Sequence, residues 1–576
     1  MRRLAAIVAL LLVAGCVGIP SSGPVRKVSE DDGLGESSVR YSPAGPVDDA
    51  SPEQIVRGYL DSMLAFPTTS RTAAAFLTPD AAKAWNPASG VRIYSKTEVA
   101  GRVPSTTGLD DPREESRGAV DVRLGYREKA RLDRQGHYAR RNRSSSVTYT
   151  LQQVDGQWRI VNPDDGLLVN EKFFADYFRS FNLFFFDRPG RRLVADPVFQ
   201  VVGDQLATSL VTSLGRGPRA GAGTSARTYV PPLKDLRPSV PVSDDGIADV
   251  EFTSDLGGMR DSARDRLSAQ IVWTLRQVPG VEGVQVVGGS SPLTANGQAV
   301  QPISSWGGYG PSLARARAYA VAGDRVVELD EAKSRPISGS WGKDARGAEL
   351  VAVSAAGVAG VLPGRGQVWI SDRDGGDAFT LPATDAIGPH WDPDGTLWLV
   401  DRGVDGTRVR IVEGEKQRVV EASDLARRRI ATFALSPDGT RYAVTSPTSG
   451  GQIRVGAVLR DAGDRLLGLG PSRRVRPSVA APRSVSWSSP TELAFLARGP
   501  SGVQAYQISI DGSATSDDLT GGASLPDVDA VALAIGSGES PDLWATDSRQ
   551  RLWFLAAQGS WRLVEGPKVT GLTAGT

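Results

Sequence analysis

The sequence is poor in the side chains on which most catalytic and metal sites depend. Its 576 residues include one cysteine, Cys16, and two histidines, His137 and His390. A single cysteine excludes an internal disulfide and a zinc site built from several thiolates. Two histidines far apart in the sequence leave little material for histidine-based catalysis. We therefore predict a chain that is not an enzyme, with no catalytic residues, no metal site and no cofactor.

Two further absences restrict the class of protein. The 66 Lys and Arg residues are balanced by 65 Asp and Glu residues, and a net charge of +1 offers no overall attraction to nucleic acid. No run of about 18 apolar residues occurs, which argues against a transmembrane helix. The 40% of hydrophobic residues is enough for packed cores, and 65 Gly with 37 Pro favour turn-rich folds.

The N-terminus has the pattern of an exported lipoprotein. Two arginines precede an apolar run, 4–14, and Gly15-Cys16 follows. This pattern predicts a signal peptide over 1–15, cleaved between Gly15 and Cys16, with lipid on the Cys16 thiol. The alternative is an ordinary signal peptide with an incidental cysteine. Residues 16–50, rich in Ser, Gly, Pro and Asp, predict a flexible tether. The predicted location is the extracytoplasmic face of the cell membrane.

Residues 51–188 have the pattern of a small α+β domain. Ser51 and Gln54 form a predicted capping box before a helix, and a second helix is expected over 72–85. Alternating segments around an Asp155-Gly156 turn predict hairpin strands. Two helices followed by a curved antiparallel sheet resemble the NTF2-like cone.

Three features of this first domain have open interpretations. His137 is expected to be exposed at a hairpin tip. Residues 113–159 hold eleven Arg or Lys against six Asp or Glu, which indicates either a solvated hairpin or a patch for anionic headgroups or wall polymers. Eight aromatic residues between 173 and 186 indicate either a partner surface or, as we expect, an aromatic join to the next domain.

Residues 189–303 predict a second α+β domain. Helices are expected over 204–214 and 263–277, with strands over 248–252 and 283–287. The order of helix, Leu214-Gly215-Arg216-Gly217-Pro218 loop, Asp-Gly hairpin, helix and Pro-Gly-Val turn resembles the GerMN domain. GerMN domains are extracytoplasmic modules without a known reaction.

Residues 304–576 contain a degenerate repeat. The segments 389–400, 433–444 and 485–496 each combine a strand, a Pro-containing turn and a second strand, at spacings of 44 and 52 residues. Such periods are typical of β-propellers, and the length allows five to seven blades, with six favoured. The strand over 316–321 is expected to close the ring with C-terminal strands such as 552–556.

Other features of the repeat region allow a functional and a structural interpretation. His390 is expected to be structural or at a blade surface. The carboxylates of 372–377 have a spacing that loosely suits Ca²⁺, but a tight turn is the simpler interpretation. Trp391, Trp398 and Trp487 are expected to be exposed, where they could stack on sugars.

The complete order resembles the actinobacterial LpqB lipoprotein family over nearly the whole chain. Residues 172–188, the loop 214–218 and the Ser-Pro-Asp-Gly type of blade turn carry the resemblance. The resemblance implies an accessory of the MtrA–MtrB two-component system that binds the extracytoplasmic part of the MtrB sensor kinase. It implies effects on cell division and envelope homeostasis, and palmitate with diacylglycerol on Cys16.

The alternatives to a kinase regulator remain open at this point. One is a cell-wall carbohydrate or peptidoglycan binder or hydrolase, which exposed tryptophans would favour. The other is a small-ligand sensor that uses the NTF2-like cone.

Overall fold

The computed structural model describes residues 43–575 except for 66–69, 104–118, 220–225, 238, 312–316, 331–332, 405, 447–450, 476–478, 480, 500–501, 514, 517–524, 526–527, 537–541 and 556–559. The predicted signal peptide, Gly15, Cys16 and most of the predicted tether lie outside the described residues. In the part of the chain that is described, no helix has the length and apolar character needed to cross a membrane. Residues 41–576 form one compact unit.

The N-terminal domain begins with the predicted capped helix, α2 (Pro52–Ser62). The Ser51 hydroxyl accepts a hydrogen bond from the Gln54 backbone N–H, and the Gln54 side chain accepts one from the Ser51 N–H at 2.7 Å. The single helix expected over 72–85 is wrong. Two short helices replace it, α3 (Arg71–Ala74) and α4 (Pro79–Ala84), because Pro79 starts a new helix that Thr78 caps.

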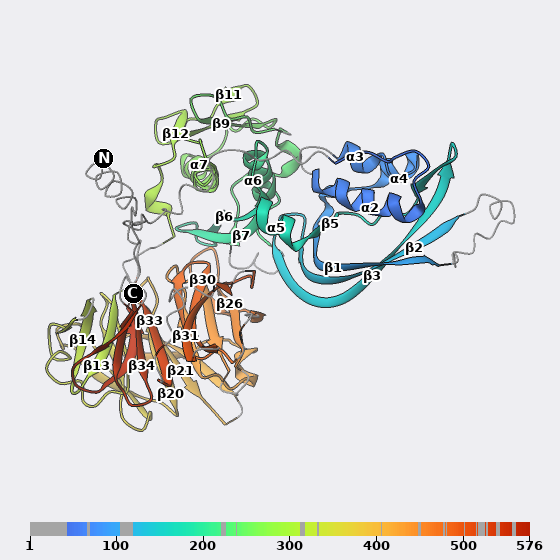
Figure 1. Ribbon diagram of the computed structural model, residues 1–576. Coiled ribbons are helices and arrows are strands. Elements are labelled where there is room, and N and C mark those ends of the chain that lie inside the picture. Colours follow the sequence, from blue (N-terminus) through green and yellow to red (C-terminus); the bar gives the residue numbers. More distant parts are fainter. Residues whose placement is uncertain are drawn as a thin grey trace, which may run out of the picture. The chain divides into compact units, whose positions relative to one another are not determined.

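A curved five-stranded sheet packs against these helices, as the predicted cone requires (Figure 1). Bulges between β1 (Val91–Val103) and β2 (Val120–Leu132) allow the long strands to bend. The interior holds buried aromatic rings: Tyr59 lies edge-on to Trp85 and to Tyr149, with centroids 5.8 and 5.9 Å apart. The strand order is β4-β3-β2-β1-β5, with β1 (Val91–Val103), β2 (Val120–Leu132), β3 (Tyr138–Val154), β4 (Gln157–Ile160) and β5 (Leu167–Asn170).

The aromatic segment lies across two hydrophobic cores. Phe173, on α5 (Glu171–Tyr177), and Phe178 belong to the core of the N-terminal domain. Phe181 and Phe185, on β6 (Phe178–Asp187), belong to the core of the middle domain. These rings are therefore used for packing inside the molecule.

The middle domain is built around α7 (Asp261–Leu275), which joins the parallel strands β9 (Ile247–Phe252) and β10 (Gly283–Gly288). Gln270 of α7 is fully buried and donates to the carbonyl of Phe184, so a helix side chain provides the hydrogen-bond donor for a buried backbone carbonyl of β6. The remaining elements are β7 (Leu193–Val201), α6 (Leu206–Gly215), β8 (Ala226–Arg227), β11 (Ser291–Pro292) and β12 (Val300–Pro302).

Within the described residues, the C-terminal strands form six blades, which confirms the favoured number. Five blades follow the chain in order. They are β16–β19 (Leu350–Val353, Val358–Val361, Gln367–Ser371, Phe379–Pro382), β20–β23 (Ala386–Trp391, Leu397–Arg402, Thr407–Glu413, Lys416–Val419), β24–β28 (Thr432–Leu435, Arg441–Thr445, Ile453–Arg460, Leu466–Leu469, Arg473–Val475), β29–β32 (Val485–Ser489, Glu492–Gly499, Gly502–Ser509, Thr515–Ser516) and β33–β36 (Ala530–Ile535, Leu543–Asp547, Leu552–Leu555, Trp561–Val564).

The remaining blade combines the two ends of the propeller sequence. The C-terminal strand β37 (Val569–Ala574) pairs antiparallel with β13 (Ala318–Ala322), and β14 (Arg325–Asp330) and β15 (Lys333–Pro336) complete the blade. The predicted closure of the ring by the first strand and a C-terminal strand is therefore confirmed. The example given for that strand, 552–556, is wrong, because residues 552–555 form β35 inside the preceding blade. Because the last strand pairs with the first, both ends of the propeller sequence lie in one sheet, and the inner edge of β13 has a hydrogen-bonding partner.

A recurrent turn holds two of the buried blade tryptophans, Trp398 and Trp553. The Asp392 carboxylate accepts hydrogen bonds from the Thr396 N–H at 2.8 Å and from the Trp398 indole N–H at 3.1 Å. Asp547 does the same for the Arg551 N–H at 2.9 Å and the Trp553 indole at 3.1 Å. The Asp-to-Trp spacing of six residues in both turns was a sequence signal for this arrangement. The prediction of exposed tryptophans is wrong for Trp391, Trp398 and Trp487, all of which are buried.

Candidate functional site in the propeller channel

The innermost strands of the six blades enclose a cavity in the propeller. Strands β16, β20, β24, β29, β33 and β37 contact one another in turn around this ring. The cavity has a volume of about 440 Å³. Small-molecule sites in proteins typically have volumes of about 300–1,000 Å³. The cavity is therefore large enough for an organic ligand.

The cavity wall is mainly apolar. Its polar side chains include Arg365, whose guanidinium pairs with Glu349 at 3.0 Å, and Thr432, whose hydroxyl contacts that of Thr445 at 2.6 Å. The apolar lining residues are Leu350, Val351, Ala352, Val353, Ile387, Pro389, Phe433, Leu435, Val531, Ala532, Leu533 and Leu572. A wall of this kind favours ligands that bury apolar surface.

Tryptophans at the ring connect neighbouring blades. The Trp391 indole N–H of β20 donates to the carbonyl of Ala352 on β16, at 3.3 Å. The Trp487 indole N–H of β29 donates to the carbonyl of Ala434 on β24, at 3.2 Å. These bonds fix the inner strands to each other, so the cavity wall is supported by the blades around it.

His390 is a polar side chain of the cavity wall. One of its ring nitrogens, Nε2, is buried and has no hydrogen-bond partner among the described residues. The imidazole lies beside the Phe433 ring, with centroids 5.3 Å apart. Burial lowers the pKa of His390 to about 4, so the ring is neutral near pH 7 and has one N–H donor and one acceptor nitrogen. This position is on an inner strand rather than at a blade surface.

The repeat alignment contained a signal for this site. Spacings of 44 and 52 residues align His390 with Ala434 and Ser486, and all three positions line the cavity. A position that faces the channel in three blades could therefore have been identified from the repeat. The sequence could not show how the His390 ring is packed, because the Phe433 ring beside it comes from the next blade.

The other histidine contradicts its prediction. His137 is buried rather than exposed, and its two ring nitrogens contact Asp133 and Asp196, each at 3.0 Å. Burial opposes the positive charge, but the hydrogen bonds to both carboxylates raise the pKa of His137 to about 9. The imidazole is therefore protonated at pH 7. Asp196 is 59 residues away in the sequence, on β7, which explains why local sequence suggested a free turn.

The turn that carries His137 docks on the middle domain. The Gln135 amide donates to the carbonyls of Ser213 and Gly217, at 3.1 and 2.8 Å. The Phe199 backbone N–H donates to the carbonyl of Gly136 at 2.9 Å. Gly136 has φ +94°, and a Cβ there would lie 2.3 Å from the Phe199 carbonyl oxygen, so glycine is required. We call the contacts of residues 133–137 with the middle domain the histidine joint.

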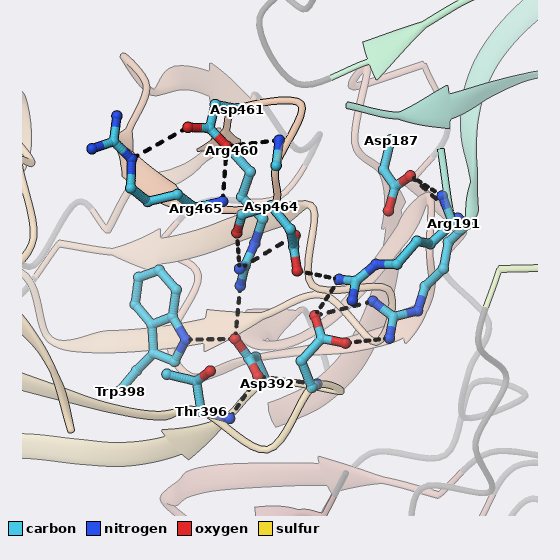
Figure 2. Close-up of polar contacts among 12 residues, drawn as sticks. Asp187, Arg191, Asp392, Thr396, Trp398, Arg460, Asp461, Asp464 and Arg465 are labelled. Atoms are coloured by element: carbon cyan, nitrogen blue, oxygen red, sulfur yellow. Dashed lines mark hydrogen bonds and ion pairs between the residues drawn. The ribbon is translucent and has the colours of Figure 1, made fainter. Parts of the chain in front are cut away.

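A second set of charged contacts links the middle domain to the propeller (Figure 2). Asp187 accepts from the backbone N–H groups of Arg191 and Arg192, at 2.7 and 3.2 Å, and so shapes the β6–β7 turn. Both arginines pair with Asp394, and Arg191 also contacts Asp464 at 2.6 Å. We call this set the arginine joint.

The arginine joint is supported by the blade turn already described. The Arg460 guanidinium contacts Asp392 at 2.9 Å (Figure 2). Burial works against the charge of Asp394, but its hydrogen bond to Arg192 keeps the pKa of this carboxyl below its ordinary value. Asp394 therefore remains ionised beside Arg192 at neutral pH. These contacts make the arginine joint a network of alternating charges.

The remaining candidate features show no organised site in the part of the chain that the structure describes. In the basic hairpin, Arg131 and Arg143 both pair with the fully buried carboxylate of Glu128, at 2.8 and 2.9 Å. Both interpretations of the basic stretch remain open, although these two cations have a structural role. Residues 372–377 include a turn in which Gly375 N–H donates to the Asp372 carbonyl. Among the described residues, no group of three or more His, Cys, Asp or Glu side chains is arranged to hold a metal ion.

Three family models match successive parts of the chain. Residues 45–175 match the lipoprotein LpqB N-terminal domain, residues 182–294 match the Germane domain of sporulation and spore germination, and residues 324–572 match the lipoprotein LpqB beta-propeller domain. The three matches follow the order of the three folded domains. They agree with the multidomain fold predicted from the sequence.

Relatives named lipoprotein LpqB match almost end to end. The protein of Thermobifida fusca is 27% identical over 96% of each chain. The protein of Streptomyces avermitilis is 26% identical over 91% of this chain and 90% of its own. The protein of Corynebacterium diphtheriae is 26% identical over 98% of this chain and 97% of its own. Since both LpqB-specific models and these full-length relatives agree, the chain belongs to the LpqB lipoprotein family.

Proposed function

We propose that this chain is a lipid-anchored extracytoplasmic regulator that binds the sensor kinase of a two-component system. The single observation that carries the proposal is the match to LpqB lipoproteins over 96% of the chain, because the family resemblance implies a kinase accessory. The proposed partner is the extracytoplasmic part of the kinase, by resemblance the MtrB kinase that acts with MtrA. The proposed mode of action is binding, without an enzymatic reaction.

Binding regulates a kinase only if it favours one of the kinase's states over the other. A stable contact requires about 800 Å² of surface on each partner. Exposed apolar side chains that can contribute to such a surface occur on the middle domain, at Val300, and on an outer propeller strand, at Val419. These positions provide starting points for locating the contact.

Photo-crosslinking in intact cells tests the proposed partner. A photoreactive amino acid at Val300 or Val419 is expected to capture the sensor kinase, which mass spectrometry then identifies. The control is the same amino acid at Val531, which is 45% exposed but belongs to the lining of the propeller cavity. Failure to recover a kinase from either outer position or by pull-down in detergent would count against this partner.

The proposed anchor has a separate test. Replacing Cys16 by Ser removes the only thiol of the chain, so the protein should leave the membrane fraction. Two or three acyl chains give durable anchoring at about 0.8 kcal/mol per buried CH2. Unchanged membrane partitioning of the Cys16→Ser protein would contradict lipid attachment at this residue, whatever the partner proves to be.

The carbohydrate-binding alternative loses its basis in the structure. Its sequence basis was exposed tryptophans, and all three of them are buried. Trp398 is held by Asp392, and Trp391 and Trp487 donate their indole N–H groups to neighbouring inner strands. None of these rings offers the free face that stacking on a sugar requires.

A further inference from the structure

We propose that the propeller cavity binds an uncharged, mainly apolar small molecule whose single polar group hydrogen-bonds to His390. This proposal goes beyond kinase regulation and does not depend on it. It rests on the size of the cavity, on the charge of its wall and on the ring of His390. These observations concern the same ring of inner strands.

The first observation is apolar surface left open inside the propeller. Val531, on inner strand β33, lines the cavity and is 45% exposed, whereas most apolar side chains of the inner strands are buried. Apolar surface in contact with water costs about 25 cal/mol per Å², which an apolar ligand would recover. The same blade has a second exposed apolar residue, Leu563 on outer strand β36, at 44% exposure. Leu563 does not line the cavity and therefore offers a matched comparison.

The second observation is the charge of the wall. The described lining residues include no Asp or Glu, and their one cation, Arg365, is already paired with Glu349. A charged ligand would lose its hydration here without gaining an unpaired opposite charge. The wall therefore selects for an uncharged molecule.

The third observation is the ring of His390, which lines the cavity and is only partly buried, although its Nε2 is enclosed and has no partner among the described residues. A hydroxyl, carbonyl or amide of a ligand in the cavity could hydrogen-bond to the accessible edge of this ring, which contributes about 0.5–1.5 kcal/mol. A Cβ at Gly388 would lie 2.7 Å from Nε2, so this nitrogen faces the backbone of its own strand, and the ligand is expected to bond to the other ring nitrogen, Nδ1. The ligand is thereby expected to lie against β20, beside Phe433.

Fluorescence titration tests the proposal with two uncharged dyes. Nile red has a carbonyl that can accept from His390, and pyrene has no hydrogen-bonding group. The full chain is used with Cys16→Ser throughout, so that no detergent competes for the dyes. Three further variants are compared: Val531→Trp, which fills the cavity; Leu563→Trp, which places the same ring on the outside of that blade; and His390→Phe, which keeps the ring shape.

The unmodified cavity is expected to bind Nile red at one saturable site. Val531→Trp should weaken binding at least tenfold, and Leu563→Trp should leave it unchanged, with circular dichroism confirming that both proteins fold. Absence of saturable binding, or equal binding by the two tryptophan variants, would overturn the cavity as a ligand site. His390→Phe should weaken Nile red binding about fivefold, corresponding to one hydrogen bond, and spare pyrene. Equal effects on both dyes would overturn the assigned role of His390.

Discussion

The two histidines of this chain show how differently two regions of one molecule use the same side chain. His137 is buried between two carboxylates in the histidine joint, and its pKa rises to about 9. His390 is in an apolar channel without a partner for Nε2, and its pKa falls to about 4. Burial disfavours the charged form in both places, so the nearby carboxylates account for the difference.

This difference separates a structural role from an available binding group. The hydrogen-bonding capacity of His137 is used within the protein, where it links the N-terminal and middle domains. His390 retains a nitrogen that the described protein does not use. The contrast teaches that scarcity of histidine did not by itself exclude a site, because one of the two residues lines a cavity.

The largest effect on stability is expected from removing the charged imidazole of the histidine joint. His137→Phe leaves Asp133 and Asp196 without their shared cation, and is expected to lower the free energy of unfolding by about 3 kcal/mol. Urea unfolding measures the change. Arg134→Ala, at an exposed position in the same turn, is the control and should change stability by less than about 0.5 kcal/mol. Equal effects of the two variants would show that the ion pairs contribute nothing specific.

The pH dependence of stability should have opposite signs at the two histidines. The folded-state pKa of His137 is above the ordinary value of 6.5, so its stabilisation is complete below about pH 6.5 and is lost as the pH rises through 9. We expect a loss on the order of 2 kcal/mol over this interval, reduced from the full shift because Asp133 is half-exposed.

At His390 the folded-state pKa lies below 6.5, so the unfolded chain binds a proton that the folded chain does not. Stability should therefore fall as the pH decreases from 6.5 to 4. The measurement is the difference between the original chain and each Phe variant across pH 4–9.5, which cancels the contribution of other groups. A difference that has the same sign at both sites would contradict the assignments of charge.

A double-mutant cycle on Arg192 and Asp394 compares the histidine joint with the more exposed arginine joint. Both side chains are 22% exposed, so we expect a coupling energy of about 1 kcal/mol. Raising the salt concentration from 0.1 to 1 M should reduce it, because screening shortens the range of the attraction. The control is the pair of Arg465 and Asp461, in which the arginine is 77% exposed and the coupling should be smaller.

The smallest expected effect is that of His390→Phe on stability at pH 7. The substitution removes an unpartnered polar atom and keeps a ring beside Phe433, so the free energy of unfolding should change by less than about 1 kcal/mol. Thermal and urea unfolding check this value. A loss as large as that for His137→Phe would show that His390 has a structural partner and would end the comparison between the two histidines.

Particular residues show where sequence reasoning succeeded. The capping box at Ser51 and Gln54 was recognisable because both partners lie within one helical turn. The propeller was recognisable because three segments repeat a strand and turn pattern, as at Asp392 and Asp438, and the length of the region then favoured the six blades that the structure has. The Cys16 prediction depends on neighbouring residues in the same way, and it awaits its membrane-partitioning test.

Particular residues also show where it failed. Pro79 divided the expected second helix, because its rigid ring suits a helix start better than a helix interior. The burial of His137 depends on Asp196, which the fold brings from β7. The ring was closed by β37 instead of 552–556, since alternation identifies strands without identifying their partners.

The sequence by itself determined the order of the domains, the blade turns and the alternation of apolar and polar residues along the strands, because these follow from residues that are close together in the chain. Only the tertiary structure decided which histidine is charged and which faces an apolar cavity. The physical reason is that a pKa and a cavity wall depend on groups from separate strands, Asp196 beside His137 and Phe433 beside His390, which meet only in the folded protein.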